Sequence, residues 1–354
     1  AYFGAYNVTN AVTLNAGALY VGSGGASGPI SLNGGGFIRA TGNYRTVSGP
    51  IRGSGGVAFD GGDSSAGITI TSSLNDFTGD VSISGAYGDV ARIILGANEV
   101  IPDTAFVNIT GGYLRADSAC IETISGLNGD ASATLFSPNA SGWTVRIGYT
   151  NASSAFAGSM GAYWETGWRG INIVKIGTGT FTMSGANIFH VGTTTVSGGR
   201  VVLNDTTAFV SPIAIGAGAE LVANSTQAFP TRWGYTKTIA INGTLIKTGS
   251  GWFDFNGAGV VVTGSGRILV QEGVFSMDSS SVNWSAFTGD VAVSNGAVLN
   301  LRNNNVTFDA LDGEGIVGND YAANTLTIGS GNGWGSFSGS IKGANAGGAD
   351  DGSN

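Results

Sequence analysis

Acidic side chains have the widest chemical scope of any residues in this 354-residue sequence. They gather in three glycine-rich stretches: Asp60 with Asp63, Asp309 with Asp312 and Glu314, and Asp350 with Asp351. Two carboxyl groups roughly 5–10 Å apart beside an open cleft hydrolyse glycosidic bonds, and oxygen-rich loops also bind calcium. Each group lies in turn sequence, however, and the Gly-Gly-x-Gly-x-Asp calcium repeat is absent. We therefore interpret these acids as solvated corners, with a catalytic pair or a calcium site as the alternatives.

The sequence contains one histidine, His190, and one cysteine, Cys120. A Ser-His-Asp triad would have to use His190, and a zinc or iron site needs a group of His, Cys or carboxylate ligands that this sequence does not provide. His190 lies in the turn segment between Asn187 and Gly192, where we expect an exposed side chain. We predict no catalytic residue, no metal and no cofactor, and hence no enzyme.

The segment 161–170 is rich in aromatic residues and also carries an arginine and a glutamate. Its candidate surface-contact residues are Tyr163, Trp164, Trp168 and Arg169. Exposed aromatic rings beside charged groups stack on sugar rings or anchor protein contacts. The alternative is a loop that folds back over the flank of the molecule and fills a groove with its tryptophans.

The composition favours a repetitive β-structure. Glycine accounts for 62 residues without a Gly-X-Y period, which excludes collagen. Only 11% of the residues are charged, which suits stacked strands because like charges about 4.8 Å apart would repel each other. The net charge of −8, with basic residues scattered singly, predicts no nucleic-acid partner. No apolar run reaches the roughly 18 residues that a membrane-spanning helix needs, so we expect no membrane insertion.

Short alternating strands must position any functional side chain in this chain. In Thr180–Met183 the apolar residues fall at every second position, the period of a half-buried strand. A Ser-Gly-Ala-Asn turn follows, and two further β-branched runs flank Ser197-Gly198-Gly199. The side chains expected to point inward are Phe181, Met183, Val196 and Val202.

Internal repetition identifies the fold class. The pattern Phe-Thr-Gly-Asp-Val occurs within 75–81 and again within 285–291. A second pattern begins at Ile147 and recurs with the same spacing from Ile328, so these two residues should behave alike, and the regions 75–183 and 285–341 are related. A stack of layers tolerates the inserted turns that separate the two copies. We predict an all-β fold with no significant helix, a single parallel β-helix (β-solenoid) over residues 1–354.

The stretch 175–203 resembles the autotransporter-associated β-strand repeat. The matching positions are Lys175, Gly177, Gly179, Phe181, Met183, Ser184 to Asn187, Phe189, Gly192 to Thr194 and Ser197 to Gly199. The resemblance implies a right-handed parallel β-helix that is secreted to the outside of a bacterial cell. It implies no substrate.

We expect an extracellular structural or adhesive protein, either a fibre or filament subunit or a segment of an adhesin passenger. The repeat pattern predicts a further layer after Ile341, where the Gly/Asp-rich tail 342–354 begins. That layer would come from more repeats of a longer chain or from a neighbouring copy stacked head to tail. Surface polysaccharide is a further candidate partner. The alternative function is an enzyme or a carbohydrate-binding module that acts on polysaccharide.

Overall fold

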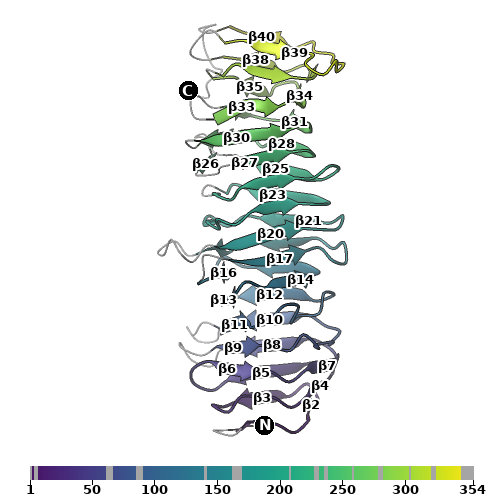
Figure 1. The fold of residues 1–354 in the computed structure, drawn as a ribbon, viewed down its shortest axis with the longest axis vertical. Helices are drawn as coiled ribbons and strands as arrows, with labels where there is room; N and C mark the ends of the chain where they lie inside the picture. The colour runs from purple at the N-terminus through teal and green to yellow at the C-terminus, as the bar shows by residue number, and fades with distance from the viewer. Residues whose placement is uncertain are drawn as a thin grey trace. The chain divides into compact units, whose positions relative to one another are not determined.

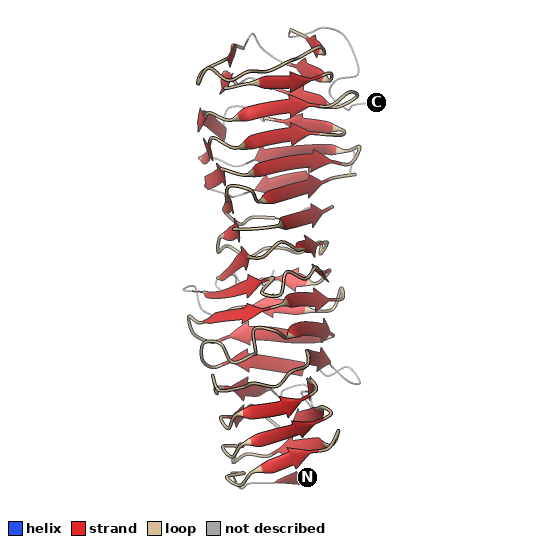
Figure 2. Cartoon of the chain, turned by 90° about the vertical axis from the view of Figure 1, so that its right-hand side faces the viewer, coloured by secondary structure: helices blue, strands red, loops and turns tan. Residues whose placement is uncertain are grey.

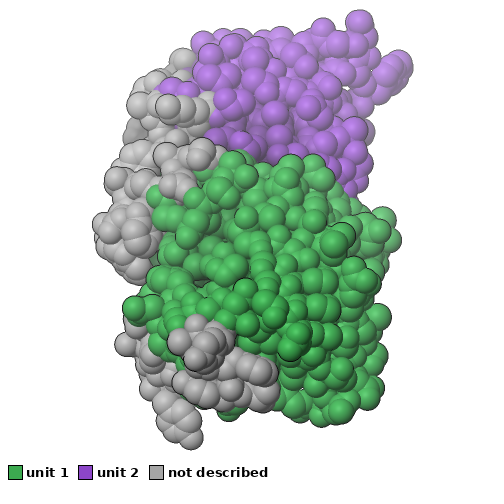
Figure 3. All heavy atoms as spheres, turned by 60° about the horizontal axis from the view of Figure 1, so that its bottom comes forward, with its two compact units in different colours: residues 1–181, 187–192 green, residues 182–186, 193–354 purple. Residues whose placement is uncertain are grey.

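The computed structural model describes residues 2–3, 7–60, 67–84, 91–138, 142–161, 170–206, 209–226, 231–234, 238–256, 259–277, 282–302, 304–319 and 324–343. Every regular element in these ranges is a β-strand, as Figure 2 shows. Within them no helix is long and apolar enough to cross a membrane. The chain divides into two compact units (Figure 3). Unit 1 comprises Ala1–Phe181 and Asn187–Gly192, and unit 2 comprises Thr182–Ala186 and Thr193–Asn354.

Unit 1 is a parallel β-solenoid whose turns pass through three strand positions, here called sides 1, 2 and 3 (Figure 1). In stacking order, side 1 contains β1 (Tyr2–Phe3), β3 (Ala18–Val21), β5 (Gly36–Ala40), β8 (Val57–Asp60), β10 (Val81–Ser84), β12 (Phe106–Thr110), β15 (Gly126–Gly129) and β18 (Ser154–Phe156). Side 2 contains β6 (Arg45–Val47), β9 (Ile68–Ile70), β11 (Ala91–Leu95), β13 (Gly112–Ala116), β16 (Thr134–Phe136) and β19 (Ser159–Met160). Side 3 contains β2 (Val12–Leu14), β4 (Ile30–Asn33) and β7 (Ile51–Ser54), followed by β14 (Ile121–Ile124), β17 (Trp143–Ile147) and β20 (Ile171–Lys175).

Unit 2 repeats this three-sided plan. Its side 1 contains β23 (Arg200–Asn204), β25 (Glu220–Asn224), β28 (Thr244–Thr248), β31 (Arg267–Val270), β34 (Asp290–Val293) and β37 (Leu311–Gly313). Its side 2 contains β26 (Thr231–Gly234), β29 (Trp252–Asn256), β32 (Val274–Ser276), β35 (Val298–Asn300), β38 (Ile316–Gly318) and β40 (Ser340–Ile341). Its side 3 contains β22 (Thr194–Val196), β24 (Ile213–Ile215), β27 (Thr238–Ile241), β30 (Val260–Gly264) and β33 (Val282–Phe287), followed by β36 (Val306–Phe308) and β39 (Leu326–Ile328). The remaining strand, β21 (Thr180–Met183), contains the boundary between the units.

The predicted all-β fold of stacked parallel turns is confirmed, since the strands of each unit pair in parallel with those of the preceding and following turns. The predicted right-handedness and the continuity of a single solenoid over 1–354 stay predictions.

The core of unit 1 is a column of apolar side chains in register. Leu19 pairs with Ile38, Ile38 pairs with Phe59, and the column continues through Ile83 and Ile109. All five side chains are buried. Burial of one such side chain contributes about 1.5–3 kcal/mol, so each added turn extends the stabilising column without enlarging its cross-section.

The core of unit 2 contains a cluster of aromatic rings. Phe253 stacks on Phe275 with ring centroids 5.5 Å apart and an interplanar angle of 15°. Trp284 lies 5.9 Å from Phe255 and 6.2 Å from Phe287. All five side chains are buried, and aromatic pairs in these arrangements add to the free energy of burial.

Asparagine side chains form ladders between adjacent turns in both units. Asn33 donates to the side chain of Asn15 at 3.0 Å, and Asn128 donates to that of Asn108 at 2.9 Å. A further pair, Asn224 with Asn204, links β25 to β23. Each ladder joins identical residues of adjacent turns.

The predicted inward positions are confirmed for Phe181, Met183 and Val196, which are fully buried. The prediction for Val202 is wrong. In β23 the buried side chains are Val201 and Leu203, whereas Val202 is only half-buried. Since Val201 and Leu203 are the apolar pair separated by two positions, they are the ones that can share the inner face of a strand.

Candidate functional site

The edge formed by β39 and β40 is the candidate functional site. β39 is the last strand of a sheet in which it pairs with β36, and β40 is the last strand of a sheet in which it pairs with β38. Figure 1 shows both strands in yellow at the C-terminal end of unit 2. In an edge strand, the N–H and C=O groups of one side remain available to another strand.

Apolar side chains are exposed along this edge. The exposed fraction is 47% for Ile328, 61% for Ile341 and 96% for Trp334, and Phe337 is half-buried. The spacing of Ile328, Phe337 and Ile341 repeats that of Ile147, Phe156 and Met160, which are fully buried. The expectation that Ile147 and Ile328 behave alike is therefore wrong.

The difference arises from what covers each copy. In unit 1, β20 pairs with β17 and places Lys175 beside Ile147. On side 2, Ile188 bridges to Met160, and the N–H of Phe189 donates to the Met160 carbonyl at 2.7 Å. A following turn therefore seals the first copy. Among the residues that the structure describes, no strand covers β39 or β40 in this way.

Two acids predicted to be solvated corners instead organise this last turn. The carboxylate of Asp309 accepts the N–H groups of Gly331 and Gly333 at 2.7 and 2.8 Å. The carboxylate of Asp312 accepts the N–H of Ser336 at 2.9 Å. Both carboxylates therefore fix the backbone of the turn.

The other predicted acids have different outcomes. Glu314 is exposed, as predicted. Asp60 is buried rather than solvated, because it lies at the end of β8 with its carboxylate 3.8 Å from the guanidinium of Arg39. Asp63, Asp350 and Asp351 lie outside the described residues, as do the predicted contact residues Tyr163, Trp164, Trp168 and Arg169.

The prediction of an exposed His190 is wrong. The side chain is fully buried, and this burial lowers its pKa to about 3, so the imidazole is neutral at physiological pH. The cause is the pairing of Ile188 and Phe189 with Met160, which draws this segment onto the preceding turn of unit 1. Within the described ranges, no three His, Cys, Asp or Glu side chains are grouped so that they could hold a metal ion.

Two buried lysines were not recognised as special from the sequence. Both begin a Lys-x-Gly-x-Gly motif, at Lys175 and at Lys247, and this recurrence is the signal that could have revealed them. The ammonium group of Lys247 donates to three backbone oxygens, those of Thr248 at 2.6 Å, Gly249 at 2.7 Å and Glu272 at 3.2 Å. The ammonium group of Lys175 donates in the same way to the next two carbonyls along the chain, at 2.5 and 3.0 Å. Burial lowers the pKa of both lysines, that of Lys247 to about 8.

Glycine is required where these ammonium groups bind. Gly177 has a φ of 66°, and a Cβ atom added there would lie 2.2 Å from the carbonyl oxygen of Gly148. Gly249 has a φ of 77°, in the same left-handed region. The motif therefore folds into a turn whose carbonyls converge on the ammonium group.

A buried carboxylate, Glu122, was also missed. It lies on β14 and accepts the N–H groups of Val100 and Ile101 at 3.0 and 2.9 Å. Burial raises its pKa to about 8; the two hydrogen bonds oppose this shift, and the charges of Glu99 and Asp103 add to it. Because Glu122 is fully buried, it cannot reach a polymeric substrate, and its protonation is instead linked to folding.

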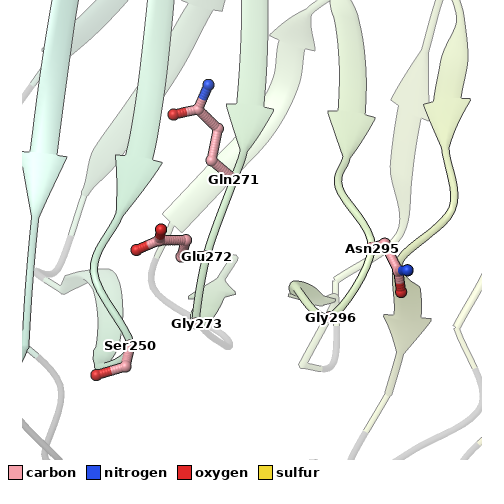
Figure 4. Close-up of a pocket in the computed structure, with 6 residues that line it drawn as sticks. All are labelled: Ser250, Gln271, Glu272, Gly273, Asn295 and Gly296. Carbon is pink, nitrogen blue, oxygen red and sulfur yellow. The ribbon is translucent and has the colours of Figure 1, made fainter.

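Unit 2 also has a shallow polar groove of about 320 Å³ (Figure 4). Its lining residues come from three successive turns: Ser250, Gln271, Glu272, Gly273, Asn295 and Gly296. These groups can hydrogen-bond to hydroxyl groups. However, the carboxylate of Glu272 already accepts the N–H of Gly249 at 2.9 Å, and the lining contains no aromatic ring on which a sugar could stack.

No family model matches this sequence, and comparison with curated proteins and with solved structures found no match either. The resemblance of residues 175–203 to the autotransporter-associated repeat stays a prediction.

Proposed function

We propose that this chain is a structural or adhesive β-solenoid of the bacterial cell surface that assembles head to tail through the edge formed by β39 and β40. The observation that carries the proposal is the exposure of Ile328 and Ile341 at positions where Ile147 and Met160 are fully buried. Unit 1 thus contains an internal example of how such a turn is completed.

The proposed completing element is another parallel turn, as in unit 1. In unit 1 the covering residues are Ile171–Lys175, which continue side 3, and Ile188, which continues side 2. Covering β39 and β40 in the same way would remove Ile328 and Ile341 from water. Because about half of each side chain is already buried, each isoleucine would contribute about 1–2 kcal/mol to the association.

A second copy of the chain provides a matching edge. β2 is the first strand of its side-3 sheet and pairs with β4 alone among the described strands. Since the strands in both units pair in parallel, β39 of one copy and β2 of the next can continue the same strand direction. Such a head-to-tail contact is heterologous, and its repetition gives a filament wherever the rotation between copies does not close a ring.

The proposed location rests on composition and on the resemblance of residues 175–203. With 11% charged residues and one buried cysteine, the chain has a weakly charged surface and no disulfide. β-Solenoid units with these properties suit a surface fibre or a passenger segment.

Sedimentation velocity over a range of protein concentrations tests the assembly. We expect species that grow with concentration, and we expect Ile341→Asp or Ile328→Asp to abolish the growth. Leu74→Asp is the matched control, because Leu74 is 63% exposed in a loop of unit 1 and should not affect assembly. A wild-type chain that stays monomeric at all concentrations, or a Leu74→Asp variant with the same defect, would contradict the proposal.

The alternative function is an enzyme that acts on polysaccharide, and the polar groove of unit 2 is the best candidate for its active site. Hydrolysis requires two carboxyl groups across the bond, and the groove lining contributes one, Glu272, which is engaged with a backbone N–H. The groove therefore favours the structural function over the enzymatic one.

A further inference from the structure

The outer face of side 2 in unit 1 carries aromatic rings and arginines. Its strands β6, β9, β11, β13 and β16 stack in order, as Figure 1 shows. The register pairs Arg45 with Ile68 and Ile68 with Ile93. Because successive residues of a strand face opposite sides, the preceding residues of these three turns form one outward row. They are Tyr44, Gly67 and Arg92. Tyr113 continues that row, because it pairs with Arg92.

These side chains form one connected surface. The guanidinium of Arg92 donates to the phenol oxygen of Tyr44 at 3.0 Å and lies 5.8 Å from the ring centroid of Tyr113. The guanidinium of Arg115 lies 5.2 Å from the ring centroid of Tyr44 and 5.6 Å from that of Phe136. Each contact lies within the range of a cation–π interaction.

Gly67 makes this arrangement possible. A Cβ atom added at Gly67 would lie 2.7 Å from two ring carbons of Tyr44 and 3.2 Å from the Cβ of Arg92. The ring of Tyr44 therefore lies over a position without a side chain and bridges from β6 towards β11. Tyr44 remains 43% exposed, and Arg92 and Tyr113 are half-buried.

The charge of this surface differs from that of the whole chain. The net charge is −8, whereas the described residues of this surface include two guanidinium groups, of Arg92 and Arg115, and one carboxylate, of Asp117. Arg115 pairs with Asp117 at 2.8 Å, and Arg92 is directed towards the phenol oxygen of Tyr44. At physiological salt the screening length is about 8 Å, so distant acids of the chain act only weakly on a ligand held beside Arg92.

We propose that the face formed by Tyr44, Arg92 and Tyr113 binds an anionic polysaccharide containing uronic acids. Guanidinium groups pair with carboxylates with well-defined geometry, aromatic rings stack on the apolar faces of sugars, and the phenol group can hydrogen-bond to a sugar hydroxyl. A strand-lined flat face presents these groups in a row with about 4.8 Å between successive turns, as an extended polymer requires. This inference is independent of end-to-end assembly, which uses β39 and β40 of unit 2 and β2 on side 3 of unit 1.

Affinity electrophoresis in gels containing polygalacturonate tests this proposal. We expect the protein to be retarded by polygalacturonate and not by neutral dextran. We expect Arg92→Gln and Tyr44→Ala to weaken the interaction at least about tenfold, the scale of losing one hydrogen bond to a charged group. Tyr44→Phe keeps the aromatic ring, so it should lose less affinity for polygalacturonate than Tyr44→Ala does. Gly67→Ala should weaken binding because the added methyl group displaces the ring of Tyr44.

The matched controls are Arg52→Gln and Tyr149→Ala, which remove an exposed arginine and an exposed tyrosine elsewhere in unit 1. Circular dichroism shows whether each variant is folded. No retardation by polygalacturonate would overturn the proposal, as would equal retardation by dextran or equal effects of the control variants. Retardation by a single-stranded oligonucleotide that competes with polygalacturonate would also overturn it, because the face would then be a nucleic-acid site.

Discussion

Ile147 and Ile328 occupy equivalent positions in two copies of one sequence pattern, yet Ile147 is fully buried and Ile328 is 47% exposed. Ile147 ends a strand that is covered by β20, with Lys175 as its register partner. Ile328 ends the last strand of its sheet. The same local sequence therefore builds a sealed turn in unit 1 and an open edge in unit 2.

Substitution of these two isoleucines should have unequal effects. We expect Ile147→Ala to lower the free energy of unfolding by about 2–5 kcal/mol, because it leaves a cavity in a packed core. Ile328→Ala should change it by less than about 1 kcal/mol at concentrations where the protein is monomeric. Urea denaturation of dilute protein measures both values. Equal losses would show that Ile328 is buried in the monomer.

In β23 the side chain of Val201 faces the core and that of Val202 faces outward, so substitutions at these two positions should have different effects. Val201→Asp should unfold the surrounding turns, since it would bury an unpaired charge. Val202→Thr should change the free energy of unfolding by no more than about 0.5 kcal/mol, because that side chain lies towards the outer face. Thermal denaturation followed by circular dichroism distinguishes the two. If Val201→Asp left the protein stable and Val202→Thr destabilised it, Val202 rather than Val201 would lie on the inner face of the strand.

Glu122 should make the stability fall as pH rises towards 8. Its pKa is about 8 in the folded protein and near 4.5 in the unfolded chain, so between these values the folded state binds more protons. The free energy of unfolding should therefore decrease from pH 5 to pH 8. In Glu122→Gln this decrease should be smaller, although the variant is less stable overall because its amide cannot accept both N–H groups.

Urea denaturation at pH 5, 6.5 and 8 measures this slope. Glu314→Gln is the control for the substitution itself, since it replaces an exposed glutamate by glutamine. A slope that is the same in the wild type and in Glu122→Gln would rule out the coupling between Glu122 and folding.

The lysine of the Lys-x-Gly-x-Gly motif should stabilise its turn. Lys247→Met removes the donor to three backbone oxygens and should cost about 1–3 kcal/mol at pH 7. The pKa of Lys247 is lowered to about 8 from 10.5, so the unfolded chain binds more protons between these values. Wild-type stability should therefore gain a contribution from pH 8 upwards that Lys247→Met lacks. Chemical denaturation of the wild type and of Lys247→Met at pH 7 and at pH 9.5 tests both expectations. If the two proteins had the same free energy of unfolding at each pH, both expectations would be refuted.

The sequence predicted the stacked β-turns because the alternation in stretches such as Thr180–Met183 is a local signal. It predicted Phe181 and Met183 correctly, since both have polar neighbours on the chain. It failed at Val202, where three consecutive apolar residues leave the inner face ambiguous, and register with the neighbouring turns decides.

The buried polar residues could not be predicted, because their burial depends on segments from other turns. His190 is covered because its segment pairs with Met160, about thirty residues earlier in the chain. Glu122 is buried because the backbone at Val100 and Ile101 provides two donors to its carboxylate. These contacts are long-range, and neither hydropathy nor spacing encodes them.

Cross-linking between copies tests the head-to-tail assembly most directly. Thr327 at the centre of β39 and Thr13 at the centre of β2 are both exposed, and the native Cys120 is buried. In the proposed assembly these two threonines of neighbouring copies lie on adjacent strands. A short bismaleimide, which tolerates a register offset of one residue, should therefore convert the Thr13→Cys/Thr327→Cys variant into a ladder of dimers, trimers and longer species, whereas neither single variant should give a ladder. A double variant that remains monomeric, or a Thr13→Cys variant that is linked as efficiently as the double variant, would contradict it.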